Sequence, residues 1–371
     1  MSKVEWKKLG EISEITIGEF VHKNKQNPKA KYPVYNGGIA PTGFYDNYNN
    51  NENKIVISAR GATAGFVNKV LCKYWAGNSS YSIDINPLLS SWLFVFYFLK
   101  NCQNRLISDQ QKGGGIPAIS KKQVQDILIP VPSLSEQNRI VGILDTFTAS
   151  IDNLKEQIAL RRKQYEYYRD QLLDLEGKEE KDVHSWGEFC EMIKGNGVQK
   201  ADFVEEGVGC IHYGQIYTHY GSFTYTTNKF VSKETFEKAR KASKGDIVMT
   251  DTSENVEDIC KSVAYLGEDD IAVSNHALIL KHKQNPKFLS YSTQTNSFFV
   301  QKRKVVVGVK VSGIKPEQLA KINIYLPSLS EQQRIVGILD VFEESIQNLE
   351  AQLSQREKQY EYYRNKLLTF E

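Results

Sequence analysis

The sequence predicts an α+β protein in which two globular domains are separated by an antiparallel two-helix coiled coil. Three observations support this prediction. One long helical segment occurs twice in nearly the same form, each copy follows a stretch that mixes strand-like runs with helices, and fainter similarities relate the two mixed stretches. The 371 residues are enough for two or three domains, each with its own core. The pattern indicates an internal duplication with a pseudo-twofold repeat.

Residues 133–176 and 328–371 are the two copies of the helical segment. Aligned without a gap at an offset of 195 residues, they are identical at 29 of 44 positions. Ser133 precedes Glu136 by three residues, and the second copy repeats this spacing, which is the capping-box pattern of a helix N-terminus. Each copy is therefore predicted to begin a helix at its first serine.

Apolar and tyrosine side chains recur in both copies at steps of three and four residues, which is typical of a coiled-coil seam. About 41 helical residues would form a rod of roughly 60 Å. Arg161 and Arg356 stand where an apolar residue is due, and they either fix the register and direction of pairing or extend their charges to solvent. The predicted seam consists of Ile140, Leu144, Phe147, Ile151, Leu154, Ile158, Tyr165, Tyr168 and Leu172 with Ile335, Leu339, Phe342, Ile346, Leu349, Leu353, Tyr360, Tyr363 and Leu367.

The helices divide the chain into four parts. Residues 1–132 are predicted to form the first globular domain, and 133–177 the first long helix, which Gly177 ends. Residues 178–327 and 328–371 are predicted to form the second globular domain and the second helix.

The two globular parts also resemble each other in short segments. Lys54–Ser58 and Asp246–Thr250 are each predicted to form a buried strand followed by a polar loop. Asn86-Pro87 and Asn285-Pro286 each precede an apolar helix. We therefore expect one α+β architecture in both domains.

Composition excludes several classes of protein. The five cysteines form no CxxC pair, so neither a disulfide framework nor a zinc site is expected. No apolar run approaches the roughly 20 residues that a transmembrane helix needs, and the N-terminus has no apolar signal segment. We expect a cytoplasmic protein without a membrane partner.

The net charge of only +3 is weak evidence that the protein binds nucleic acid.

The duplicated architecture nevertheless suits double-stranded DNA. Paired heads held apart by a rigid element read two half-sites in dimeric DNA-binding proteins, although a duplicated scaffold would look the same. The loops carry side-chain types that can read base edges or contact phosphates, and each of these residues could instead be an ordinary solvated loop residue. The candidates for DNA contact are Lys23, Lys25, Asn36, Arg60, Asn78 and Lys112 in the first domain and Tyr213, Gln215, Asn275, His276, Lys302 and Arg303 in the second.

The doubled motif PSLSEQxRIVxxLD, at Pro132–Asp145 and Pro327–Asp340, resembles the repeated regions of specificity subunits of type I restriction–modification systems. The resemblance covers the whole chain. It implies a subunit that reads an asymmetric bipartite DNA site and positions two methyltransferase subunits, which nuclease subunits join. It also implies that S-adenosylmethionine binds to the methyltransferase subunit and that this chain binds no cofactor. No recognition loop matches a fixed motif, so no base-contacting residue can be assigned from the family.

Catalytic motifs are absent from the sequence. It contains no [ND]PP[YF] motif of amino-methyltransferases, no GxxxxGK[ST] loop and no HExxH or other metal-binding histidine spacing. Glu52-Asn53-Lys54 and Glu176-Gly177-Lys178 match half of a nuclease signature, but matches of three residues are common by chance. We therefore predict a chain without catalytic activity and without a metal site.

Overall fold

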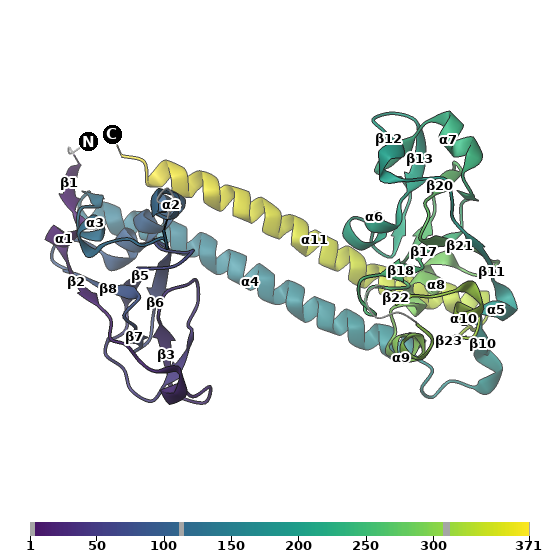
Figure 1. The fold of residues 1–371 in the computed structure, drawn as a ribbon, viewed down its shortest axis with the longest axis horizontal. Coiled ribbons are helices and arrows are strands. Elements are labelled where there is room, and N and C mark those ends of the chain that lie inside the picture. The colour runs from purple at the N-terminus through teal and green to yellow at the C-terminus, as the bar shows by residue number, and fades with distance from the viewer. Residues whose placement is uncertain (1–3, 111–114, 307–311, 371) are drawn as a thin grey trace. The chain divides into compact units, whose positions relative to one another are not determined.

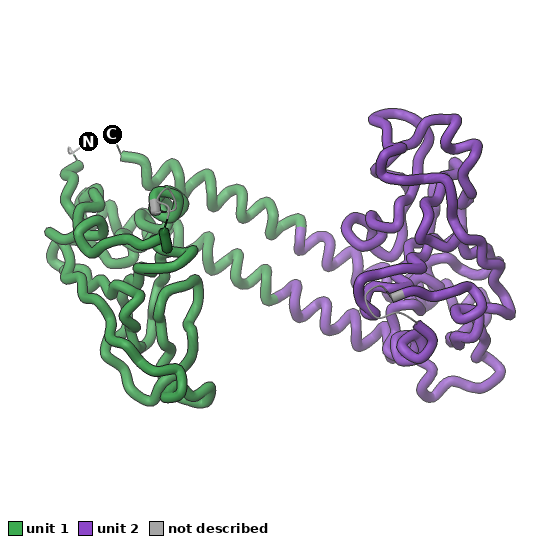
Figure 2. The backbone as a smooth tube through the Cα atoms, in the orientation of Figure 1, with its two compact units in different colours: residues 1–156, 351–371 green, residues 157–350 purple. Residues whose placement is uncertain are grey.

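The computed structural model describes residues 4–110, 115–306 and 312–370. The chain divides into two compact units, of which one contains residues 1–156 with 351–371 and the other contains residues 157–350 (Figure 2). Each unit holds one globular domain together with a stretch of both long helices.

The first globular domain is a mixed structure of strands and helices (Figure 1). A 3-10 turn at Lys23–Lys25 follows its second strand. The strands are β1 (Glu5–Lys8), β2 (Ser13–Ile17), β3 (Tyr32–Tyr35), β4 (Gly43–Tyr45), β5 (Lys54–Ser58), β6 (Val67–Val70), β7 (Trp75–Ala76), β8 (Ser80–Ile85) and β9 (Leu128–Val131), and the helices are α1 (Leu9–Ile12), α2 (Trp92–Gln110) and α3 (Lys121–Gln125).

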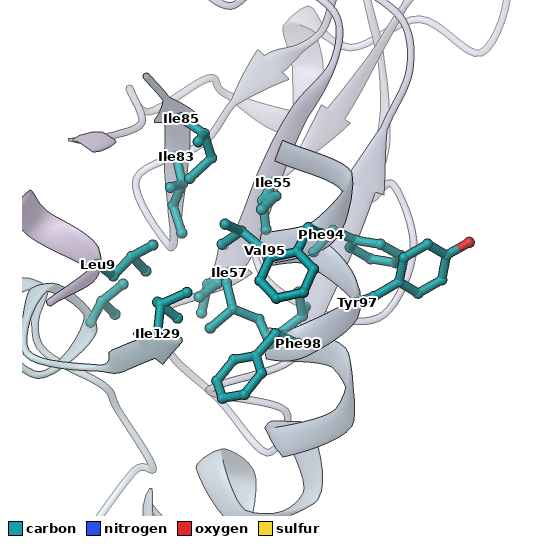
Figure 3. Packing of buried hydrophobic residues seen from close by; sticks show 14 of the residues in the cluster. Leu9, Ile55, Ile57, Ile83, Ile85, Phe94, Val95, Tyr97, Phe98 and Ile129 are labelled. Carbon is teal, nitrogen blue, oxygen red and sulfur yellow. The ribbon is translucent and has the colours of Figure 1, made fainter. Parts of the chain in front are cut away.

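An antiparallel sheet in the order β2-β8-β5-β6 forms the centre of this domain. Successive side chains of a strand point to opposite faces. Ile55 and Ile57 accordingly pack with Phe94 and Val95 of α2 (Figure 3), while Val56 packs on the other face with a separate cluster. The predicted buried strand at 54–58 is therefore the middle of a sheet that is covered on both faces.

The second globular domain is larger. Its strands are β10 (Val183–Ser185), β11 (Glu191–Lys194), β12 (Phe203–Val204), β13 (Val208–Ile211), β14 (Phe223–Thr224), β15 (Lys229–Val231), β16 (Lys241–Ala242), β17 (Ile247–Thr250), β18 (Thr252–Ser253), β19 (Ser262–Tyr265), β20 (Ile271–Val273), β21 (Ala277–Lys281), β22 (Ser312–Gly313) and β23 (Asn323–Tyr325). Its helices are α5 (Trp186–Phe189), α6 (Tyr213–Thr218), α7 (Lys233–Lys238), α8 (Pro286–Ser292), α9 (Asn296–Val305) and α10 (Pro316–Leu319).

The second domain repeats the central sheet of the first. Four strands stand in the order β11-β21-β17-β19, with β14 added at one edge. A smaller sheet is also repeated. The first domain has β4-β3-β7, and the second has β15-β13-β20 with the same antiparallel and parallel pairings, extended by β12 and β16 at its two edges. The first domain has the single helix α2, and the second has α8 and α9 in its place. The helix is interrupted at residues 293–295, where the Thr295 side chain caps the N-terminus of α9. The domains therefore share one framework but differ in what surrounds it.

The two long helices are α4 (Leu134–Leu173) and α11 (Leu329–Leu367). In the first unit the Phe147 ring stacks on Tyr363, with centroids 5.4 Å apart. In the second unit Tyr168 stacks on Phe342, also at 5.4 Å. The start of each helix therefore lies beside the end of the other, and the pairing is antiparallel. Helix α4 ends four residues before the predicted Gly177, which instead adopts a φ of 76° in the turn that follows.

A buried glutamine attaches the start of each long helix to its own domain. Gln137 donates a hydrogen bond to the carbonyl oxygen of Pro132 (2.8 Å) and accepts one from the backbone N–H of Ser91 (2.8 Å). Gln332 donates to Pro327 (2.8 Å) and accepts from the N–H of Asn285 (3.0 Å). The polar residues of the repeated motif thus have a structural function, because each satisfies buried backbone groups.

Candidate nucleic-acid interface

Three segments meet at one end of the central sheet in the first domain. The N–H of Ala59, just after β5, donates to the carbonyl oxygen of Ser79, just before β8 (2.8 Å). The N–H of Ile119 donates to the carbonyl oxygen of Ala59 (2.9 Å), and Arg60 forms a β-bridge with Ala118. We call residues 59–61, 77–79 and 117–119 the first loop cluster.

The second domain builds the same arrangement from equivalent segments. The N–H of Asp251, after β17, donates to the carbonyl oxygen of His276, before β21 (3.2 Å). The N–H of Ile314 donates to the carbonyl oxygen of Asp251 (3.0 Å), and Thr252 pairs with Gly313. Residues 251–253, 274–276 and 312–314 form the second loop cluster.

The first loop cluster exposes polar side chains from a tightly connected backbone. Arg60 and Asn78 are exposed. Asn36 points inward, because its side-chain oxygen accepts the N–H of Ser79 (3.1 Å). A Cβ atom at Gly77 would collide with this same oxygen. Asn36 therefore positions the loop, and Arg60 and Asn78 are the side chains that the loop presents.

The second loop cluster centres on His276. Its backbone has a φ of 65°, and its side chain is 53% exposed. The ring lies 5.4 Å from the ring of Tyr213, and Nδ1 lies 3.3 Å from the Thr252 hydroxyl. That hydroxyl donates to Asp251 (2.8 Å), a carboxylate that also pairs with the Lys194 ammonium (3.0 Å). His276 is therefore held from several sides while its ring remains open to solvent.

Asn275 and Tyr213 complete this cluster. The Asn275 side-chain oxygen accepts the N–H of Gly197 (3.1 Å), and the N–H of Tyr213 donates to the Ser274 hydroxyl (2.9 Å). Both contacts fix the loop before β21 to its neighbours.

Two predicted contact residues have structural functions instead. Lys302 is only 4% exposed, and its ammonium donates to the carbonyl oxygens of Glu257 (3.0 Å) and Ile259 (2.8 Å). Burial lowers the pKa of Lys302. Gln215 is 9% exposed, and its side chain bonds the backbone N–H of His212. Neither side chain is on the surface, where it would have to be to meet DNA.

The remaining candidates are outside the residue ranges of the two clusters. Lys23 and Lys25 are exposed in the 3-10 turn. Arg303 is exposed on α9, with its guanidinium 5.8 Å from the Phe299 ring centroid. Lys112 lies outside the described residues.

The types of residue in the loops did not identify every part of the two clusters. They did not indicate Asp251, Thr252 or the segments before α3 and α10. The alignment of the two long helices at an offset of 195 residues can be continued upstream, where it pairs Ala118 and Ile119 with Gly313 and Ile314. This signal in the sequence would have identified the segments before α3 and α10.

The predicted seam serves two purposes along its length. In the middle of α4, Ile151, Leu154 and Ile158 are buried, and on α11 Ile346, Leu349 and Leu353 are half-buried. The ends of the seam join the domain cores. The core of the first domain includes or contacts Ile140, Leu144, Tyr360 and Leu367, and that of the second includes or contacts Tyr165, Leu172, Ile335, Leu339 and Phe342.

The two seam arginines take equivalent positions. The Arg161 guanidinium lies 5.9 Å from the Phe342 ring centroid, and that of Arg356 lies 5.7 Å from Phe147. Cations within about 6 Å of an aromatic face are attracted to it. Both arginine side chains are therefore half-buried beside an aromatic ring of the paired helix.

Residues 4–110, 115–306 and 312–370 contain no group of three or more His, Cys, Asp or Glu side chains that could hold a metal ion. No helix in these ranges has the length and apolar character needed to cross a membrane.

Comparison with known proteins identifies relatives over the full length of the chain. The model of the type I restriction modification DNA specificity domain matches residues 1–161 and 178–357. The EcoR124I/EcoR124II specificity subunit of Escherichia coli is 29% identical over 408 residues, which cover 99% of this chain and 95% of that protein.

Solved structures share the fold. The type I restriction–modification S subunit of Mycoplasma genitalium has a TM-score of 0.66 and 20% identity, with coverage of 100% of this chain and 98% of that one. A chain from a structural study of type I complex assembly has a TM-score of 0.58 and 17% identity, with coverage of 99% and 97%. Because the family model matches nearly the whole chain, in two copies, this protein belongs to the family of type I restriction–modification DNA specificity subunits.

Proposed function

We propose that each globular domain reads one half of an asymmetric bipartite site in double-stranded DNA, and that the chain performs no catalysis. The observation that carries this proposal is the duplicated framework. Both domains have the same four-strand order and the same glutamine attachment to a long helix, yet the second has additional edge strands, and the loops differ. Two heads with one framework and different surfaces are suited to two different half-sites.

We further propose that the long helices bind two methyltransferase subunits, which nuclease subunits join in the restriction complex. Packing explains why buried residues are identical in the two helices. Exposed positions are free to differ, as Thr146 and its equivalent Val341 do, yet several exposed positions are also identical. One partner bound twice accounts for repeated exposed residues. The exposed pairs include Arg139 with Arg334, Gly142 with Gly337, Lys163 with Lys358 and Tyr167 with Tyr362.

The glycine pair is the most informative of these. A glycine inside a helix costs about 1 kcal/mol relative to alanine. Apart from the neighbouring residues of its own helix, nothing in the described part of the chain lies within 4 Å of a Cβ added at Gly142 or Gly337, so tertiary packing within that part does not require either glycine. Close approach by a partner would supply the reason. The methyl donor S-adenosylmethionine is expected on that partner, and the assembled complex in the cytoplasm.

Methylation mapping tests the proposed DNA reading. The chain would be co-expressed with a methyltransferase subunit of the same system, and methylated bases would be mapped at single-base resolution. We expect a bipartite motif with two different halves and an unread gap. A continuous motif, or no sequence preference with both subunits present, would reject the proposal.

Replacement of the helix glycines tests the partner surface. Gly142→Gln with Gly337→Gln should raise the stability of the isolated chain by about 1 kcal/mol, because glutamine favours the helix, yet should weaken binding of the methyltransferase subunit. Thermal melting and the mass of the complex measure the two effects. The control is Asp152→Gln, an exposed position where the copies differ. A glycine-free variant that still bound two partner subunits at unchanged affinity would contradict this surface.

A further inference from the structure

We propose that the two loop clusters are the base-reading elements, with Arg60 and Asn78 facing the first half-site and His276 facing the second. The inference rests on the proposed function, because it assumes that both domains bind DNA. It assigns the reading to the end of the sheet after β5 and β17 and to particular side chains there.

Equivalent backbones with different side chains are the first argument. The N–H of Ala59 bonds Ser79 as the N–H of Asp251 bonds His276, and both clusters then bond the segment before a short helix. Arg60 therefore corresponds to Thr252 and Ser79 to His276, so the side chains differ at these two positions, whereas Asn78 and Asn275 are the same residue at a third. Two domains that must read different sequences need different side chains at one place on a common framework.

The clamping of the loops is the second argument. Gly18 follows β2, and an added Cβ there would collide with the carbonyl oxygen of Gly77. Gly195 follows β11, and its Cβ would collide with the carbonyl oxygen of Ser274. In both domains a glycine thus lets the edge strand close directly onto the reading loop. Side chains that recognise bases must be held within a fraction of an ångström, and such clamping provides that rigidity.

The chemistry of the exposed groups is the third argument. Guanidinium groups read guanine and amide groups read adenine through paired hydrogen bonds in the major groove. Arg60 and Asn78 offer both groups on neighbouring loops. In the second cluster Nδ1 of His276 faces the Thr252 hydroxyl, so Nε2 is the nitrogen that would meet a base edge.

Backbone strain supports the assignment at His276. Its left-handed conformation, with a φ of 65°, is uncommon for residues other than glycine. Such residues persist where their surroundings hold them, and they cluster at functional sites. Here the buried Asp251 carboxylate supports Thr252, which in turn contacts the ring.

Two substitutions test the proposal in the full chain co-expressed with a methyltransferase subunit. Arg60→Thr introduces the residue that the equivalent position of the second cluster holds. His276→Asn introduces a residue that tolerates a positive φ. Each variant should lower discrimination at one base position about ten- to hundredfold, Arg60→Thr in the first half-site and His276→Asn in the second. Methylation mapped at single-base resolution reports both halves at once.

Controls separate this inference from the proposed function. Lys283→Ala lies beyond the opposite end of β21 and should leave both half-sites unchanged, and thermal melting should show that all variants are folded. A folded Arg60→Thr or His276→Asn protein with an unchanged motif would overturn the inference while the bipartite reading stands. A change in the other domain's half-site would also overturn it. If the unaltered chain directs no bipartite methylation, the proposed function itself fails.

Discussion

A half-buried carboxylate distinguishes α11 from α4 where the helix joins its domain. Glu343 occupies the position that Thr148 occupies in the first copy. It accepts a hydrogen bond from the Ser222 hydroxyl (2.5 Å), and Asp340, which binds the Tyr291 hydroxyl (2.7 Å), lies one turn away. Burial raises the pKa of Glu343 above its usual range, and the negative charge of Asp340 adds to this shift.

The raised pKa predicts that Glu343 makes stability depend on pH. The folded chain holds this proton more tightly than the unfolded chain does, so the free energy of unfolding falls as pH rises from the unfolded value of about 4.3 through the folded pKa. Glu343→Gln keeps an oxygen that can accept from Ser222 and removes the charge. We expect this variant to melt higher than the wild type at pH 7, with the difference shrinking toward pH 4.5.

Melting curves over this pH range measure the effect. Glu344→Gln is the matched control, because its side chain is the exposed neighbour and its replacement should leave the pH dependence unchanged. If the Glu343→Gln and wild-type curves run parallel, ionisation of Glu343 does not contribute to stability.

Single residues were the hardest feature to predict from the sequence. Lys302 stands in a basic run with Arg303 and Lys304, which suggests three exposed charges. Only the tertiary structure shows that carbonyl oxygens more than 40 residues earlier surround one of them. Arg60, Asn78 and His276 are exposed, as their loops in the sequence suggested, and their contact with DNA stays a prediction.

At the scale of elements, charge distinguishes two helices that are otherwise nearly identical. Lys155 on α4 pairs with Glu357 on α11 (3.5 Å) in the first unit, and Arg162 pairs with Glu350 (2.5 Å) in the second. In the repeat, Lys155 corresponds to Glu350 and Arg162 to Glu357. Two copies of α4 paired in this way would bring lysine against arginine, and two copies of α11 would bring glutamates together. The charges therefore favour pairing of α4 with α11.

Charge reversal tests this pairing preference. Lys155→Glu with Arg162→Glu should turn two attractive pairs into repulsive ones and lower stability by about 1–2 kcal/mol at low salt, since half-exposed pairs contribute little each. Adding Glu350→Lys and Glu357→Lys should restore most of the loss. Denaturant unfolding at two salt concentrations measures both steps. A double variant as stable as the wild type at low salt would show that these pairs do not select the partner helix.

The long helices were predictable from the sequence because a single pattern, the heptad spacing of apolar residues, runs along each of them. The heptad spacing located α4 and α11 within a few residues, but it could not show that their ends belong to domain cores, because apolar residues contact a helix or a sheet equally well. The capping-box pattern was half right. The N–H of Glu136 bonds the Ser133 hydroxyl (3.3 Å), while the Glu136 carboxylate binds Arg139 through two hydrogen bonds.

At the scale of the whole molecule, each domain begins and ends in one strand pair. In the first domain β1 pairs antiparallel with β9. In the second, β10 pairs with β23, and the N–H of Leu326 donates to the carbonyl oxygen of Asp182 (2.7 Å). The chain thus enters and leaves each domain at adjacent points. The sequence revealed the duplication because the helices repeat strongly, whereas β12 and β16, which extend the smaller sheet of the second domain, have no counterpart among the described residues of the first.

This closure predicts that the second domain can be exchanged as a unit. Replacing residues 183–325 with the equivalent domain of another specificity subunit cuts the chain only at β10 and β23, and leaves Gln332 and both long helices in place. In the wild type, Gln284 and Asn285 form hydrogen bonds with Gln332. The new domain would need to supply equivalent groups at these two positions. We expect the hybrid to direct methylation to a motif whose first half is unchanged and whose second half is that of the donor. Single-base methylation mapping beside both parents decides the matter, and a hybrid that altered both halves would show that the domains do not read DNA independently.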